Sequence, residues 1–167
     1  MSGPPFTVQP LGIQDRSAFT CGVEALDRYL HSQVGQDVRR RVTACYVAVE
    51  TATGEIAGYY TLSASEVLLA DMPAELARKL PRYPGLPVAR LGRLAVARKH
   101  QGHKLGAALL LDAAARATRS EIAVFALVVD AKDDQAVAFY RHHGFQPFGP
   151  TDRQLVAPIA TFKEILI

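Results

Sequence analysis

The sequence predicts an α/β fold with a mixed, mostly antiparallel sheet, a central β-α-β crossover and flanking helices. The first observation is that apolar, β-branched segments alternate with segments whose apolar residues recur every three or four positions. The second is the order strand, Gly-containing loop, helix and strand over Val88–Ala131, which places two strands in parallel. The length of 167 residues suits one domain, so residues 1–167 are predicted to form a single domain.

The first half of the chain is predicted to contain a strand, two helical pieces and a β-hairpin. Val23, Leu26 and Leu30 lie three and four positions apart, as on one face of a helix. The turn at Thr51–Gly54 separates two apolar runs and predicts the hairpin. The expected elements are a strand at Phe6–Leu11, helices at Gly22–Leu30 and from His31 towards Arg39, and strands at Ala44–Glu50 and Glu55–Ala64.

The second half begins with a proline-rich segment. The prolines between Ala70 and Pro87 predict a fixed irregular loop with one helical turn around Ala74–Leu80. Asp133 suits the start of a later helix, and Gly144 suits the position just past its end. The expected elements are a strand at Val88–Val96, a helix at Lys104–Thr118, a strand at Ala123–Ala131, a helix at Asp133–His143, and strands at Gln146–Phe148 and Leu155–Phe162.

The loop that follows Val96 carries the strongest functional signal. A loop of this kind feeds a helix whose first N–H groups lack partners and whose dipole adds a partial positive charge. Such an end binds anions, and pyrophosphate is the usual ligand. No acidic residue occurs from Leu76 to Leu111, although the net charge of the whole chain is only +3. This basic block indicates a polyanionic ligand or partner, and a solvated basic face is the alternative.

Composition argues against several classes of protein. No apolar run approaches the roughly 20 residues that cross a bilayer, and the N-terminus lacks the pattern of a signal peptide. Cys21 and Cys45 are the only cysteines, too few for a disulfide framework. The histidines have no spacing suited to zinc, so no metal site is predicted. The expectation is a cytoplasmic protein without a membrane contact.

Three motifs in a fixed order resemble the GCN5-related N-acetyltransferase (GNAT) family. Leu94-Ala-Val96 precedes Gln101-Gly-His-Lys-Leu-Gly106, which is similar to the family's pyrophosphate loop. The second motif is Asp133-Asp-Gln-Ala136 leading to Phe139-Tyr140, at the family's spacing from the loop to Tyr140, and the third is His142-His-Gly-Phe145. The order of these motifs makes the resemblance specific, whereas each motif alone is a weak signal. The sequence departs from the pattern at Lys104, where the family usually has glycine.

The resemblance implies a GNAT domain with a binding site for acetyl-CoA and assigns roles to particular residues. The residues implied in pyrophosphate binding are Gln101, Gly102, His103, Lys104, Leu105 and Gly106. The further cofactor residues are Leu94, Ala95 and Val96, which pair with the pantetheine amides, together with Asp133 and Phe139. Tyr140 is the catalytic candidate, because a phenol with a pKa near 10 can protonate the leaving thiolate.

A narrower resemblance covers other segments and is to the GNAT toxins of type II toxin–antitoxin modules. The segments are Phe19-Thr-Cys-Gly22, Leu26-Asp-Arg-Tyr-Leu30, Gly58-Tyr-Tyr-Thr-Leu-Ser63, Leu80-Pro-Arg-Tyr-Pro84 and Leu91-Gly-Arg-Leu-Ala-Val96. This resemblance implies an enzyme that acetylates the amino group of aminoacyl-tRNA and so blocks translation. It also implies a ribbon-helix-helix antitoxin protein as partner and a homodimeric toxin.

Basic residues are the candidates for binding the tRNA substrate. They are Arg39, Arg40, Arg78, Lys79, Arg82, Arg90 and Arg93. Arg90 and Arg93 have antitoxin carboxylates as alternative partners. The basic block from 76 to 111 as a whole has three candidate ligands, which are tRNA, the antitoxin and CoA.

No residue stands out as a general base. Glu55, Glu66 and Asp71 are candidates by position only. An α-amino group has a pKa of about 8, so it needs less help from a base than a lysine side chain does. Two other functions fit the residues: a GNAT that acetylates a small amine or a protein N-terminus, and a non-catalytic module that binds CoA or nucleic acid.

Overall fold

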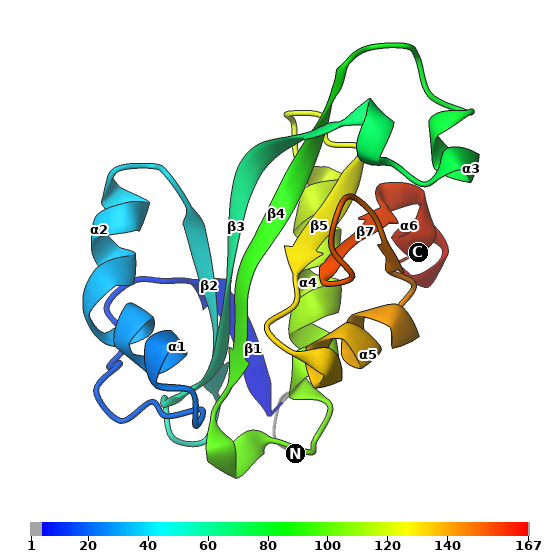
Figure 1. Cartoon of the computed structure of the whole chain (residues 1–167). Helices are drawn as coiled ribbons and strands as arrows, with labels where there is room; N and C mark the ends of the chain where they lie inside the picture. Colours follow the sequence, from blue (N-terminus) through cyan, green and yellow to red (C-terminus); the bar gives the residue numbers. More distant parts are fainter. Residues whose placement is uncertain (1–4, 167) are drawn as a thin grey trace. The chain divides into compact units, whose positions relative to one another are not determined.

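The computed structural model describes residues 5–166 and contains a seven-stranded sheet with the order β1-β2-β3-β4-β5-β7-β6 (Figure 1). The strands are Phe6–Pro10 (β1), Ala44–Glu50 (β2), Ile56–Leu68 (β3), Gly85–Val96 (β4), Ala126–Asp130 (β5), Gln146–Pro147 (β6) and Gln154–Pro158 (β7). β4 pairs with β5 in parallel, whereas β1–β2, β2–β3, β5–β7 and β6–β7 are antiparallel. The predicted α/β class with a mixed, mostly antiparallel sheet is therefore confirmed.

The helical elements lie largely where the sequence predicts them. They are α1 (Glu24–Arg28), the π-helix η1 (Tyr29–Gln33), α2 (Val34–Arg39), the 3-10 helix η2 (Leu69–Asp71), α3 (Ala74–Ala77), the 3-10 helix η3 (Arg98–His100), α4 (Leu105–Arg119), α5 (Asp134–His142) and α6 (Ile159–Leu166). The chain divides into two compact units. The first unit comprises residues 1–63 and 92–113, and the second comprises 64–91 and 114–167.

The core of the first unit joins the N-terminal helices to the β2–β3 hairpin. In Figure 1 the helices α1 and α2 lie beside β2, and α2 packs on this strand. Leu30 and Val34 are fully buried one helical turn apart, in the same cluster as Tyr59. The Tyr59 hydroxyl donates a hydrogen bond of 2.6 Å to the carbonyl oxygen of Leu26. The sequence predicts two helical pieces here. In the structure, residues 24 to 39 form one helical run in which the π-helix η1 joins α1 to α2.

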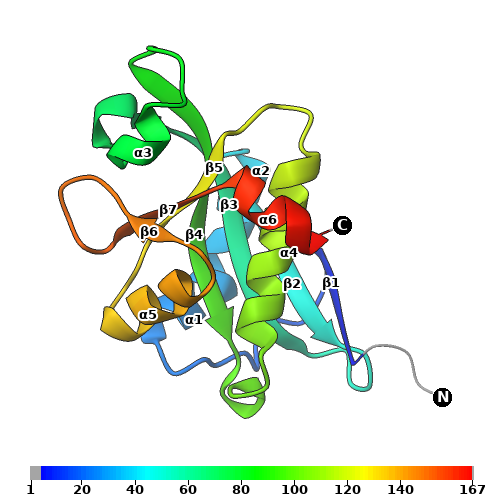
Figure 2. The same ribbon diagram turned by 90° about the vertical axis from the view of Figure 1, so that its right-hand side faces the viewer.

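The second unit packs α6 against β5 and β7 (Figure 1 and Figure 2). The predicted strand at Leu155–Phe162 is wrong beyond Pro158, because Ile159 begins α6. The Ile159 N–H donates to the carbonyl oxygen of Phe125 at 2.9 Å, and Phe162 is fully buried with its ring 5.9 Å from that of Phe145. Burial of Ile159 and Phe162, three positions apart, matches one face of a helix and not the predicted strand.

Candidate active site

The end of β4 is held in place by contacts within the first unit. The Ala97 N–H donates to the carbonyl oxygen of Ala57 at 2.8 Å. The side-chain nitrogen of Gln101 donates to two carbonyl oxygens, those of Cys21 and Val96, each at 2.9 Å. Gln101, a residue predicted to bind pyrophosphate, therefore uses its side chain to tie the loop after β4 to the segment before α1.

The loop from 101 to 104 has a conformation suited to an anion. Gly102 and Lys104 both adopt left-handed backbone angles, with φ of 83° and 65°. The first helical hydrogen bond after the loop joins the Ala108 N–H to the Lys104 carbonyl oxygen, at 3.2 Å. The N–H groups of Leu105, Gly106 and Ala107 therefore have no acceptor within the helix. They are the donors that an anion at this end of α4 would meet.

Space and charge at the loop also fit a diphosphate. The side chains from Gln101 to Lys104 are exposed, and a Cβ added at Gly102 would meet no atom within 4 Å. The first turn of α4 contains no acidic residue. Free N–H donors, a positive helix end and open space together fit the diphosphate of acetyl-CoA. The left-handed angle of Lys104 costs about 1–2 kcal/mol, since a side chain is disfavoured there.

The predicted pantetheine contacts lie at the end of β4. The register of β4 with β5 ends at the pair Leu91↔Val129, and Leu94, Ala95 and Val96 follow later in the strand. The side chain of Ala95 is buried, whereas those of Leu94 and Val96 are partly exposed. The Ala95 carbonyl oxygen would lie 2.9 Å from a Cβ at Gly58, so glycine permits a close approach of the two backbones.

Helix α5 fixes Tyr140 in the second unit through both of its ends. Asp133 caps the start of the helix, where its carboxylate accepts a hydrogen bond of 2.8 Å from the Ala136 N–H. At the other end, Gly144 has φ of 97° and the Phe145 N–H donates to the Tyr140 carbonyl oxygen at 3.1 Å. Together with the bond from the Gly144 N–H to the Arg141 carbonyl oxygen, this is a Schellman motif.

The Schellman motif explains why a tyrosine and a Gly-Phe pair occur at this spacing. The motif brings the residue after the glycine back against the residue that lies three positions from the helix end. The rings of Phe145 and Tyr140 accordingly meet edge to face, 5.3 Å apart. A Cβ at Gly144 would also lie 2.9 Å from the Thr161 methyl group. A side chain at this position is therefore disfavoured both by the left-handed backbone angle and by this contact.

The environment of Tyr140 keeps its hydroxyl protonated. The side chain is 8% exposed and contacts the rings of Phe139 and Phe145. Burial raises the pKa of Tyr140 above its ordinary value near 10, because the phenolate is poorly solvated there. Among the residues whose side chains the structure describes (5–163), none is a hydrogen-bond partner of this hydroxyl. Tyr140 is therefore a neutral proton donor with a free hydroxyl.

Asp133 and Phe139 were both predicted to contact the cofactor. The Asp133 carboxylate accepts its hydrogen bond from the helix backbone, and the Phe139 ring lies 4.9 Å from that of His143. Burial, assisted by the neighbouring His142, lowers the pKa of His143, so this imidazole favours its neutral form. These contacts give Asp133 a capping role and Phe139 a packing role around Tyr140.

The seven predicted tRNA contacts are distributed over both units. Arg39, Arg40 and Arg93 belong to the first unit, and Arg78, Lys79, Arg82 and Arg90 belong to the second. The Arg90 guanidinium donates to the Asp130 carboxylate at 2.7 Å. The Arg93 guanidinium lies over the ring of Tyr29, with 3.5 Å between the guanidinium carbon and the ring centroid. Sequence reasoning missed Tyr29, although it occurs in the motif Leu26-Asp-Arg-Tyr-Leu30.

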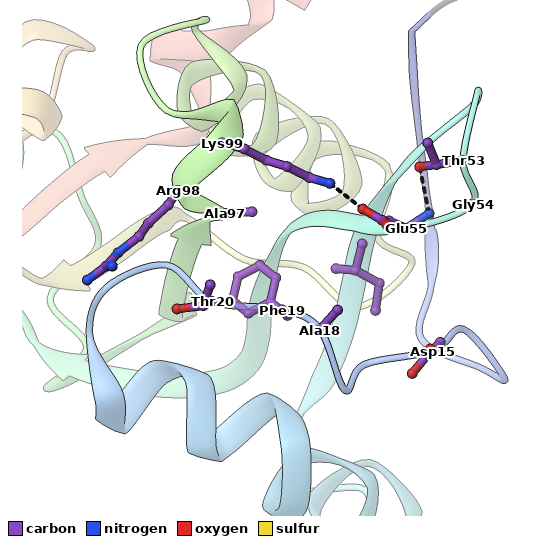
Figure 3. Close-up of a pocket in the computed structure, with 11 residues that line it drawn as sticks. Asp15, Ala18, Phe19, Thr20, Thr53, Gly54, Glu55, Ala97, Arg98 and Lys99 are labelled. Carbon is purple, nitrogen blue, oxygen red and sulfur yellow. Dashed lines mark hydrogen bonds and ion pairs between the residues drawn. The ribbon is translucent and has the colours of Figure 1, made fainter.

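A cavity of about 510 Å³ lies in the first unit, between the tip of the β2–β3 hairpin, the loop before α1 and η3 (Figure 3). Figure 3 shows the Lys99 ammonium donating to the Glu55 carboxylate beside it. Glu55, one of the candidate bases, is thus paired with a cation. Of the other two candidates, Glu66 packs over Gly85, where its carboxylate would clash with an added Cβ at 2.4 Å.

The remaining chemistry of the described residues is limited. Among the side chains of residues 5–163, no group of His, Cys, Asp and Glu gathers as a metal site. In the same range no helix is long and apolar enough to cross a membrane. Cys21 and Cys45 are buried and form no disulfide, and burial raises the pKa of Cys45 to about 12. A thiol held in its protonated form is a poor nucleophile.

The model of the acetyltransferase (GNAT) family matches residues 15–145 of the chain. The chain therefore belongs to the acetyltransferase (GNAT) family. It is 36% identical over 140 residues to the "tRNA-acetylating toxin" of Mycobacterium tuberculosis. The matched region covers 83% of this chain and 81% of that protein.

Two solved structures of a toxin named AtaT have the same fold. The first, AtaT complexed with acetyl-methionyl-tRNAfMet, superposes with a TM-score of 0.88 at 28% identity and covers 97% of this chain and 99% of that chain. The second, a tyrosine-to-phenylalanine mutant of AtaT bound to the C-terminus of the antitoxin AtaR and acetyl-CoA, has a TM-score of 0.79 at 25% identity. It covers 98% of this chain and 99% of that chain.

Proposed function

We propose that this chain is an acetyl-CoA-dependent N-acetyltransferase that acetylates the α-amino group of aminoacyl-tRNA and so blocks translation. The observation that carries the proposal is the buried Tyr140 hydroxyl, which is protonated and has no partner among the described residues. The family match and the tRNA-acetylating relatives support the reaction class and the acceptor. The family model spans segments of both units, which supports one catalytic domain over 1–167.

The loop after β4 would hold the diphosphate of acetyl-CoA. The N–H groups of Leu105, Gly106 and Ala107 supply donors, and the left-handed angles of Gly102 and Lys104 turn the chain into the helix. Gln101 and His103 belong to the same exposed loop, with Gln101 acting as its anchor. The backbone groups of Leu94, Ala95 and Val96 would pair with the amides of the pantetheine arm, as an added strand pairs with a sheet edge.

Tyr140 would act as the general acid. Acetyl-CoA supplies a thioester, which the acceptor amine attacks, and the C–S bond breaks to leave a thiolate. The Tyr140 hydroxyl can hydrogen-bond this sulfur and deliver its proton. Because burial raises the pKa of Tyr140, the proton is present over the whole physiological pH range.

The acceptor amine would need little help from a base. The α-amino group has a pKa of about 8, so part of it is already neutral near pH 7. One oxygen of the Glu55 carboxylate pairs with the Lys99 ammonium, so this candidate base has a cationic partner beside it. A water molecule suffices to take the second proton from such an amine.

Arg39, Arg40 and Arg93 of the first unit would bind the tRNA phosphates. Arg39 and Arg40 are exposed at the end of α2, and Arg93 lies on the Tyr29 ring with its guanidinium oriented. A planar guanidinium held against an aromatic ring keeps its N–H edges available for a phosphate. We also propose that the partner of this chain is a ribbon-helix-helix antitoxin, and the antitoxin-bound structure of AtaT supports an antitoxin as partner. The same proposal includes a homodimer and a cytoplasmic location.

The decisive experiment measures transfer of labelled acetyl groups from acetyl-CoA to charged tRNA. Tyr140→Phe removes only the hydroxyl, so we expect kcat to fall by about 100-fold or more with KM nearly unchanged. The matched control is Tyr59→Phe, because the Tyr59 hydroxyl donates to a backbone carbonyl oxygen. This control should cost about 1 kcal/mol of unfolding free energy and leave kcat within a few-fold.

Two results would contradict the proposal. If every charged tRNA remains unmodified while a polyamine or a peptide N-terminus is acetylated, the acceptor is wrong. If the protein binds acetyl-CoA tightly but transfers acetyl to no amine, and Tyr140→Phe changes nothing, the chain is a binding module.

A further inference from the structure

His100 ends η3 and directly precedes the loop that is proposed to bind the diphosphate. Its side chain is 12% exposed, and its Nε2 atom is buried. Among the side chains and backbone groups of residues 5–163, none makes a hydrogen bond with this nitrogen. A buried polar atom without a partner is costly and is rare in folded proteins outside functional positions.

A carboxylate faces this nitrogen from the end of β2. Glu50 Oε1 lies 3.9 Å from His100 Nε2, which is about 1 Å beyond the length of a charge-assisted hydrogen bond. The same oxygen accepts a hydrogen bond of 2.8 Å from the Thr53 hydroxyl, so the carboxylate is held in place. The Phe6 ring of β1 meets the imidazole edge to face, with 5.2 Å between the ring centroids. The imidazole therefore has a carboxylate and an apolar ring as neighbours.

The chemistry of the pair favours one form of the imidazole. An ionised carboxylate only accepts hydrogen bonds, so it attracts Nε2 only when this atom carries a hydrogen. The neutral tautomer with its hydrogen on Nδ1 turns a lone pair toward Glu50, whereas the imidazolium carries a hydrogen on both nitrogens. The imidazolium also adds the opposite charge to the hydrogen bond. Proton uptake by His100 would therefore draw the imidazole and Glu50 together.

The other charged groups beside the pair belong to the β2–β3 hairpin and to η3. The hydrogen bond to Glu55, together with the nearby charge of Glu50, raises the pKa of Lys99. Lys99 thus keeps its charge throughout the range in which histidines titrate, about pH 5 to 8. Phe6, which packs on the imidazole from β1, has no charge. Within this group, His100 is the residue whose charge changes in that range.

A bond between His100 and Glu50 would give the diphosphate loop a second anchor. The Gln101 side chain already ties the loop to the segment before α1 and to the end of β4. Further along, the side chains of His103 and Lys104 are exposed and have no hydrogen-bond or ion-pair partner among the described side chains. The second anchor would hold the start of the loop to β2. A loop restricted in this way loses less ordering free energy when it binds a ligand.

We infer that His100 is a positioning residue whose proton-dependent contact with Glu50 sets the affinity of the loop for acetyl-CoA. The protonated imidazole holds the loop in the form that binds the diphosphate, and loss of the proton releases this anchor. Such coupling is reciprocal, so bound acetyl-CoA raises the protonated fraction of His100. The inference rests on the proposed binding of the diphosphate by this loop and is independent of the acetyl acceptor.

The test measures the dissociation constant of 3′-dephospho-acetyl-CoA by calorimetry between about pH 5.5 and 8. This probe keeps the diphosphate but lacks the phosphate monoester, whose second pKa near 6 would itself make binding pH-dependent. We expect the wild type to lose affinity about fivefold or more as the pH rises over this range. His100→Gln and Glu50→Gln should each bind the probe with an affinity that does not change with pH.

His31→Gln is the matched control for removal of a histidine from the same unit. The Nε2 atom of His31 already lies 2.9 Å from the carbonyl oxygen of Phe19 and contacts neither Glu50 nor the loop. This control should keep the pH dependence of the wild type. A second measurement needs no variant, because the NMR shift of the His100 Cε1–H group reports its protonated fraction. We expect that fraction to rise near pH 7 when the probe is added.

Several outcomes would overturn the inference. They are a wild-type affinity that stays constant with pH, a pH dependence that survives in His100→Gln or Glu50→Gln, and a His100 shift that ignores the probe. Failure of the diphosphate site itself has a separate signature. Acetyl-pantetheine, which lacks the diphosphate, would then bind as tightly as the probe, and Gly102→Ala would not weaken binding of the probe. A constant affinity with a normal effect of Gly102→Ala would reject only the role of His100.

Discussion

The Arg93 guanidinium lies over the ring of Tyr29, with its carbon 3.5 Å from the ring centroid. The Tyr29 hydroxyl donates to the Asp37 carboxylate at 2.7 Å, so the platform is held from the side opposite its chain attachment. The contact with the ring orients the guanidinium of Arg93, which lies in the part of β4 that belongs to the first unit. Tyr29 is the first residue of the π-helix η1, and π-helical turns are frequent at functional sites.

The stack predicts different effects for two substitutions of Tyr29. Tyr29→Phe keeps the ring but loses the hydrogen bond to Asp37, so we expect a loss of about 1 kcal/mol in unfolding free energy and normal kinetics. Tyr29→Leu removes the platform and releases Arg93, so KM for charged tRNA should rise with kcat unchanged, as in Arg93→Gln. Urea denaturation and steady-state kinetics measure both. A KM for Tyr29→Leu equal to that of Tyr29→Phe would show that the ring does not orient Arg93.

Gly102 and Gly54 form a matched pair for testing the diphosphate loop. Both have left-handed angles, with φ of 83° and 75°, and a Cβ at either would meet no atom within 4 Å. Alanine at each position should therefore cost a similar amount of stability, about 1 kcal/mol. Only Gly102→Ala should also raise KM for acetyl-CoA, because it disturbs the N–H donors at the start of α4. Equal KM values in the two variants would argue against a role for this loop in binding.

Substitution of Lys104 by glycine should raise the stability of the fold, whereas substitution of Gly102 by alanine should lower it. The φ of Lys104, 65°, is strained for a side chain, and Lys104→Gly relieves that strain while adding freedom to the unfolded chain. We expect a net gain of about 0.5–1 kcal/mol, together with a KM for acetyl-CoA that rises at low salt because a positive charge is lost. Arg41→Gly is the control, since Arg41 has φ of 59° just past α2 and should gain stability without a change in KM. Destabilisation of Lys104→Gly would mean that its side chain makes a favourable contact that outweighs the strain.

Cys45 predicts a loss of stability in alkaline solution. Burial raises the pKa of its thiol from 9.0 to about 12, so above pH 9 the unfolded chain releases a proton that the folded chain keeps. The unfolded state then binds fewer protons, and the unfolding free energy falls as pH rises, by up to about 1.4 kcal/mol per pH unit. The stabilising contribution is complete below pH 9 and disappears towards pH 12.

The measurement for Cys45 is urea denaturation at pH 7, 8, 9 and 10 with a reductant present. Cys45→Ala should have a lower unfolding free energy at pH 7 and a shallower fall between pH 9 and 10. Burial and the hydrogen bond to Asp37 also raise the pKa of Tyr29, to about 12, so the wild type and the variant should both weaken above pH 10. Parallel curves between pH 9 and 10 would refute the assignment to Cys45.

The sequence by itself determined the elements whose chemistry is local. The helix at Asp133–His143 is predicted because Asp133 is an N-terminal cap and Gly144 is a helix terminator, and the structure contains both. The hairpin around Thr51–Gly54 and the order β4, loop, α4 and β5 are predicted by residue spacing alone. Each of these signals acts within a few residues of the chain, so a linear pattern records it.

Tertiary structure decided the features that join residues distant in sequence. Gln101 anchors the loop on a carbonyl oxygen 80 positions earlier, and Arg90 pairs with an aspartate 40 positions later. The same reason explains the wrong prediction at Ile159–Phe162, where burial against β5 and β7 selects a helix over the predicted strand. The stack of Arg93 on Tyr29 belongs to this group as well. Pairings of this kind depend on which surfaces the folded chain brings together, and no local propensity encodes that choice.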